Sequence, residues 1–218
     1  MRNSLRDIVS LMSALLICFN LPVHAQDLSF EAMGGTAWNL PMPLKILYPD
    51  EEPIKVNARY RTRPFRGAPY YALRFTYVGW SAELLHHKIY LRNPATPVDR
   101  FEVSHGYNMA TVTRTLDDAS IFRIGIGFVV AHPEGEIRGK PIHPVKSFIG
   151  GGYHFSGVCL QASAGPRLGL AEHFFLRPEA KLTIAWARVP LADGGTATVP
   201  NIAVHTLIGI GYKNPEKD

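Results

Sequence analysis

Two residues of the chain, His154 and Ser156, have the types and the spacing of a hydrolytic pair. Side chains at positions i and i+2 of a strand point to the same face. The imidazole could therefore act as the general base, and the hydroxyl as the nucleophile, of an esterase. The carboxylate that such a site needs could come from Glu134 or Glu136 in the preceding loop. The alternative is a pair of polar residues at a membrane interface. Extrapolation from the strand that follows predicts that both side chains face outward.

Other histidines of the chain have the side chains that metal ions bind. His86 and His87 are adjacent, but neighbouring strand residues point to opposite faces, so only a β-bulge could bring them together. A loop predicted for residues 132–150 contains His132, Glu134, Glu136 and His143. The spacing of these four residues matches no recognised metal motif. We therefore predict no metal ion and no cofactor.

A larger set of charged residues alternates with apolar residues along predicted strands. In residues 174–186, for example, Arg177, Glu179 and Lys181 share one face, and the other face is apolar. A strand of this length suits a tilted crossing of a bilayer, which needs about nine to eleven residues. We expect the charged faces to fill a barrel lumen with a network of ion pairs, although a small pore or an internal ligand site is an alternative. The expected inward residues are Arg59, Arg61, Arg74, Glu83, Glu102, Arg123, Arg177, Glu179, Lys181 and His205.

The same alternation recurs from Ile54 to Tyr212 and predicts eight antiparallel strands. The expected fold is an all-β, closed, up-and-down transmembrane β-barrel at 54–212, preceded by a lead-in at 26–53 and followed by a tail at 213–218. A hairpin within 28–48 would raise the count to ten. Turns near residues 79, 117 and 171 are short, whereas the connections at 64–69, 93–99, 132–150 and 190–200 are longer. Short turns belong on the periplasmic side and longer loops outside the cell.

The N-terminus has the features of a secretory signal. Arg2 and Arg6 precede an apolar run at 8–19, and an A-x-A-like site ends at Ala25, so residues 1–25 are predicted to be cleaved. The mature chain would keep a single cysteine, Cys159, which excludes an internal disulfide. The formal net charge of +5 is modest, and the basic residues alternate into strands. No surface for nucleic acid is expected.

In architecture and pattern, residues 54–212 resemble the small outer-membrane β-barrels of the OmpA and OmpX type. The resemblance implies a monomer in the outer membrane whose partners are membrane lipid, lipopolysaccharide and the barrel-assembly machinery. Such barrels usually end on an aromatic residue, whereas here Tyr212 is followed by the six-residue tail at 213–218. The expected function is a structural or interaction role through the extracellular loops.

Two alternatives remain open at this level. The tripeptide from His154 to Ser156 is similar to the His-x-Ser of the lipid A 3-O-deacylases, which are also small outer-membrane barrels. That similarity implies a lipid A acyl-ester hydrolase with a lipid-facing site. The other alternative is a secreted or periplasmic, lipocalin-like barrel with apolar residues inside. Small residues and glycines among the charged faces favour a crowded polar interior over a solvent surface.

Overall fold

The computed structural model describes residues 28–117, 121–142, 145–147 and 150–214 of the chain. The signal peptide predicted for residues 1–25, the tail beyond residue 214 and His143 lie outside these described residues. All regular secondary structure in the described residues is β-strand, which confirms the predicted all-β fold. None of these residues belongs to a helix long and apolar enough to cross a membrane.

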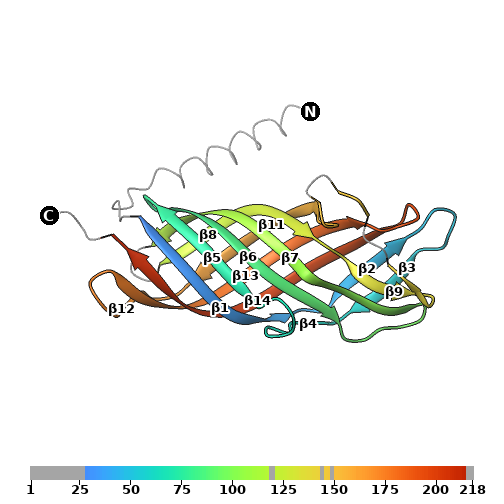
Figure 1. Ribbon diagram of the computed structural model, residues 1–218, viewed down its shortest axis with the longest axis horizontal. Helices are drawn as coiled ribbons and strands as arrows, with labels where there is room; N and C mark the ends of the chain where they lie inside the picture. Colours follow the sequence, from blue (N-terminus) through green and yellow to red (C-terminus); the bar gives the residue numbers. More distant parts are fainter. Residues whose placement is uncertain (1–27, 118–120, 143–144, 148–149, 215–218) are drawn as a thin grey trace, which may run out of the picture.

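Eight strands form a closed antiparallel barrel (Figure 1). In ring order they are β1 (Ser29–Asn39), β5 (Tyr71–Tyr77), β6 (Trp80–Leu91), β7 (Val98–Asp117), β8 (Phe122–Ala131), β11 (His154–Ala164), β13 (Phe174–Pro190) and β14 (Thr196–Lys213). The ring closes at β1, where Phe30 lies opposite both Phe75 of β5 and Tyr212 of β14. The prediction of eight strands is therefore confirmed.

The predicted start of the barrel at Ile54 is wrong, because the first barrel strand is β1, inside the predicted lead-in. Glycine usually weakens the interior of a strand. At Gly35 the pairing requires it, since a Cβ on this residue would come 2.1 Å from the Thr206 carbonyl oxygen. Residues 54–61, expected as the first barrel strand, form the short strands β3 (Ile54–Ala58) and β4 (Tyr60–Arg61).

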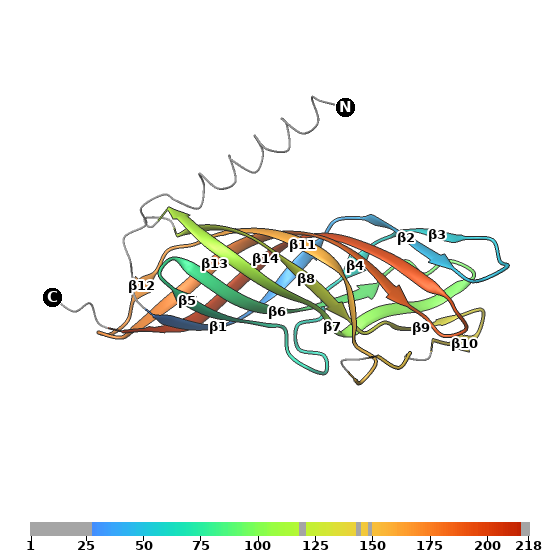
Figure 2. The ribbon, with the colours of Figure 1, turned by 90° about the horizontal axis from the view of Figure 1, so that it is seen from above.

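A second sheet region continues the barrel at the end opposite Leu28 and Asn214, the first and last described residues (Figures 1 and 2). We call the end at Leu28 and Asn214 the terminal end. It contains β2 (Met42–Leu47), β3, β4, β9 (Glu134–Ile137) and β10 (Lys140–Pro141). Ile46 of β2 pairs with Ala197 of β14, and Phe101 of β7 pairs with Gly135 of β9. We call these strands, with the strand ends that they pair with, the distal extension. The remaining short strand, β12 (Leu168–Gly169), pairs with β13 at the terminal end.

The connections divide between the two ends as the sequence predicts. The turn at 78–79 and the connection at 165–173 lie at the terminal end, where the Asn214 amide donates to the Leu28 carbonyl. The connections that carry β2–β4 and β9–β10 lie at the other end. The register of β6 against β7 shifts between His87 and Ile89, as it does across a β-bulge.

The outside of the barrel is apolar, although the lumen next to it is charged. Large apolar side chains stand exposed on the outward face: Phe30, Leu73, Phe75, Leu84, Val112, Ile126, Phe128, Val158, Leu160, Leu182, Ile184, Val204, Ile208 and Ile210. We call this surface the apolar belt. Apolar residues outward with charges inward are the arrangement of a transmembrane β-barrel, because lipid surrounds it.

Candidate functional site

The lumen beneath the apolar belt is built around one guanidinium group, that of Arg74 on β5. Its nitrogens lie 2.6 Å from carboxylate oxygens of Glu31 on β1, Glu83 on β6 and Glu179 on β13. All four side chains are 0% exposed. A buried charge is tolerated only when it is paired and hydrogen-bonded, and here one cation joins three other strands across the barrel.

Further cations surround this centre. Lys181 forms ion pairs with Glu83 and, at 3.5 Å, with Glu179. Arg177 Nε lies 3.3 Å from Glu31 Oε2. We call the whole set the lumen ionic cluster: Glu31, Arg74, Glu83, Arg123, Arg177, Glu179 and Lys181. Because its carboxylates are all engaged by these cations, the cluster is suited to holding strands together.

Neutral polar groups lie beside the cluster. His205 Nε2 is 2.8 Å from Thr183 Oγ1, and Nδ1 of the same ring bonds the Tyr70 hydroxyl. His87 Nε2 lies 3.0 Å from Asn39 Oδ1. His86, its neighbour in sequence, stacks on Tyr71 instead, with ring centroids 5.1 Å apart. The pair therefore points to opposite faces and forms no metal site.

The structure divides the residues that were predicted for the lumen. Arg74, Glu83, Arg123, Arg177, Glu179, Lys181 and His205 are buried inside the barrel. The prediction is wrong for Arg59 and Arg61, which are exposed. It is also wrong for Glu102, which is partly buried and forms an ion pair with the exposed Arg100. It also missed Glu31, although the alternation from Ser29 to Met33 was a usable signal.

The predicted catalytic pair is not assembled. His154 Nε2 donates to the Val145 carbonyl at 3.1 Å, whereas Ser156 Oγ donates to the backbone carbonyl of His154 at 2.8 Å. Ser156 is only 6% exposed, so the expectation that it faces outward is wrong. The reason is a β-bulge, where the register of β11 against β8 shifts at this residue.

Basic residues gather instead on the outward face of the distal extension. Lys45 of β2 lies directly opposite Lys55 of β3, and Arg59 and Arg61 are also exposed. We call these four residues the basic stripe. Arg61 pairs with Trp38, which is 68% exposed. Tryptophan is enriched where a membrane meets water, so the stripe begins at the border of the apolar belt.

A second basic group lies close to the stripe. The charged groups of Arg63, Arg66 and Lys88 lie 5.1, 5.9 and 5.8 Å from the ring centroid of Tyr90. Arg61 is paired with the same Tyr90 across β4 and β6. Positive charge is therefore concentrated on one side of the barrel, just beyond the belt.

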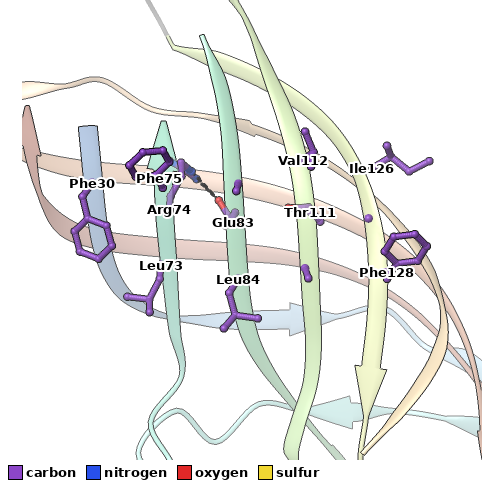
Figure 3. Close-up of a pocket in the computed structure, with 13 residues that line it drawn as sticks. Phe30, Leu73, Arg74, Phe75, Glu83, Leu84, Thr111, Val112, Ile126 and Phe128 are labelled. Carbon is purple, nitrogen blue, oxygen red and sulfur yellow. Dashed lines mark hydrogen bonds and ion pairs between the residues drawn. The ribbon is translucent and has the colours of Figure 1, made fainter. Parts of the chain in front are cut away.

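The belt itself is hollowed between its large side chains (Figure 3). Phe30 and Phe75 border one side of a hollow of about 490 Å³, and Ile126 and Phe128 border the other. Small residues lie between them: Ala82, Ala110 and Gly127. A Cβ on Gly127 would come 2.0 Å from the Ala110 carbonyl oxygen, so only glycine allows the two strands to approach. The apolar lining suits a lipid acyl chain.

No protein-family model matches the chain, and no curated protein is significantly similar to it in sequence. Among solved structures, it is similar to Neisserial surface protein A at 9% identity and a TM-score of 0.42, over 88% of this chain and 100% of the other. The outer membrane protein OprG from Pseudomonas aeruginosa gives 14% identity and a TM-score of 0.46, over 88% and 97%. The outer membrane protein AlkL gives 10% and 0.46, over 91% and 97%. At these identities the likeness concerns the fold alone.

Proposed function

We propose that this protein is an integral outer-membrane protein whose distal extension faces the cell exterior and interacts there with lipopolysaccharide. The observation that carries this proposal is the contrast between a filled lumen and an elaborated distal end. Buried side chains of the lumen ionic cluster occupy the barrel interior, whereas five of the six short strands that the described residues form outside the ring, β2, β3, β4, β9 and β10, enlarge the surface at the distal end.

The position of the basic stripe favours an anionic partner at the membrane surface. Lys45 and Lys55 are cross-strand neighbours, and like charges directly opposite each other are destabilising. A bound anion offsets that repulsion. Because Arg61 adjoins the exposed Trp38 at the border of the apolar belt, the stripe lies at the level of lipid headgroups. The phosphate groups of lipopolysaccharide are anions at that level.

The orientation is tested by labelling single cysteines on intact cells with a membrane-impermeant maleimide. Lys55→Cys, on the distal extension, should be labelled without lysis. Glu172→Cys, exposed in the connection at the terminal end, should be labelled only after the outer membrane is permeabilised. Native Cys159 is 1% exposed and provides the background. Labelling of Glu172→Cys alone on intact cells would reverse the proposed orientation.

The interaction is tested with folded protein in detergent and purified lipopolysaccharide. The triple variant Lys55→Gln, Arg59→Gln, Arg61→Gln should bind more weakly than the native protein, and the difference should shrink at high salt, which screens exposed charges. Lys146→Gln is the matched control, because Lys146 is an exposed cation in the connection between β8 and β11, on the opposite side of the barrel from β1 and the stripe. Equal binding by the triple variant and the control would refute a role for the stripe.

A further inference from the structure

Three side chains that could hold a metal ion meet where the distal extension joins the barrel. They are His105 on β7, His132 just after β8 and Glu134 at the start of β9. One ligand atom from each lies within 4.8 Å of the other two. His105 Nδ1 is 2.8 Å, and His132 Nε2 is 3.8 Å, from the same oxygen, Glu134 Oε1.

Neighbouring groups hold these side chains in place. Ser104 Oγ donates to Glu134 Oε2 at 2.8 Å, which leaves Oε1 directed at the two histidines. The Tyr153 hydroxyl donates to the His105 carbonyl at 2.9 Å, and its ring lies edge-on to His132 at 5.2 Å. Such outer contacts fix the orientation of ligands in metal sites.

Two imidazoles and one carboxylate are a donor set that zinc uses in proteins, with a water completing a tetrahedron. Imidazole also suits copper and nickel, whereas calcium and magnesium require a shell of oxygen ligands. We propose that His105, His132 and Glu134 bind a first-row divalent transition-metal ion, with Zn²⁺ as the natural probe. Metal–ligand distances of about 2.0–2.2 Å require only small movements of side chains that are already adjacent.

The site is open to solvent and bridges separate segments. The His105 side chain is 58% exposed, and it also lines a hollow of about 410 Å³ together with His86 and Asn108. Because its ligands come from β7, from the end of β8 and from β9, a bound ion clamps the start of the connection between β8 and β11 to the barrel.

The site could not be recognised from the sequence pattern. The candidate metal ligands in the loop predicted for residues 132–150 included His132 and Glu134 but not His105, which is far away along the chain. The antiparallel pairing of β7 with β9 places Glu102 opposite Glu134 and so brings the segments together.

The test measures Zn²⁺ binding to the mature chain, folded in detergent and free of any histidine tag, by isothermal titration calorimetry. We expect one ion per chain. Glu134→Gln and His105→Gln should each abolish that binding, and Ser104→Ala should weaken it about tenfold, as loss of a group that orients a ligand does. Co²⁺ should give the visible absorption of a tetrahedral site in the native chain and in the control, but not in Glu134→Gln or His105→Gln. His173→Ala, at the terminal end, is the matched control.

The outcomes are distinct, provided that each variant keeps the heat-sensitive mobility of the folded barrel. Loss of binding in Glu134→Gln and His105→Gln, with native binding in His173→Ala, establishes the site. Native binding by Glu134→Gln and His105→Gln, or no binding by the native chain, overturns the proposal. Either result is independent of the interaction with lipopolysaccharide, because no residue of the basic stripe is altered.

Discussion

The barrel under the apolar belt and the distal extension place polar and apolar residues in opposite ways. In the belt region of β13, Arg177 and Lys181 face inward, and Ile184 faces outward. In the distal extension, Val56 on β3 is buried, and Lys55 beside it is exposed. In both regions, polar and apolar residues alternate along the strands with a period of two. What differs is the medium outside the sheet, which is lipid around the belt and water around the extension.

Some individual strands run through both the belt region and the distal extension. On the inner face of β7, Thr113 and Thr111 give way to Met109, Val103 and Phe101, all of them buried. The distal extension therefore has a core like that of a water-soluble protein, in which the hydrophobic effect stabilises burial. Under the belt, where the lipid is as apolar as the side chains, ion pairs and hydrogen bonds must hold the interior together.

The largest effect that separates the two regions is expected from Arg74→Met. The substitution leaves three buried carboxylates without the cation that they share, and breaking a buried ion pair costs about 3–5 kcal/mol. The free energy of unfolding in urea, followed by the mobility shift of the folded barrel, should fall by this amount. Arg61→Met, at an exposed site, should stay within about 0.5 kcal/mol of the native protein. Equal midpoints for the two variants would contradict the structural role of the cluster.

The next effect is expected in the apolar core of the distal extension. Ile46 is 0% exposed, and truncation to alanine costs about 2–5 kcal/mol through lost burial and a cavity. Because β2 pairs with the barrel only near one end of β14, we expect Ile46→Ala to loosen the extension while the barrel stays folded. Trypsin should then cleave after Lys45 or Lys55 faster than in the native protein. Asn57→Ala, on the exposed face of β3, serves as the control. If trypsin cleaved Asn57→Ala as fast as Ile46→Ala, the result would count against a packed core in the distal extension.

A smaller effect compares the two outer surfaces directly. Ile126 is 62% exposed on the apolar belt, and an arginine on the lipid face of a barrel costs about 2–4 kcal/mol near the bilayer midplane. Ile126→Arg should therefore lower the yield and the stability of protein folded into lipid vesicles. Asn57→Arg, on the distal extension, should change neither. If both arginines were tolerated equally, the belt would not lie in lipid.

The smallest effect is expected from Ser156→Ala. The Ser156 hydroxyl is buried and bonded to a backbone carbonyl, so its removal should leave lipid A unchanged. Mass spectrometry of lipid A from cells that express the native protein, Ser156→Ala or His154→Ala measures this. An acyl chain that is missing with the native protein and present with both variants would instead establish a deacylase.

Much of the barrel could be predicted from local pattern. The barrel strands other than β1 alternate strongly enough to be found, and most of the lumen ionic cluster follows from the charged faces. The short strands β9 and β10 lie within the loop predicted for residues 132–150 and were not found. The strand β1 was missed because its glycines resemble breaks. Only the partner strand reveals that Gly35 lies where a side chain would meet the Thr206 carbonyl. The prediction that His154 and Ser156 share an outward face is wrong for a similar reason. A β-bulge that depends on the pairing of β11 with β8 turns Ser156 inward.

The alternation of residue types is enough to predict long antiparallel strands with two unlike faces, because side chains alternate along any strand. Which of the two faces is inside depends on how the strands assemble. Residues 54–61 carry the same alternation as the belt strands, yet their basic face lies outside because β2 and β3 extend beyond the barrel into water. The tertiary structure also decided that Arg74 meets three carboxylates and that His105 meets Glu134. Those contacts join distant segments, and only the closure and register of the barrel bring the segments together.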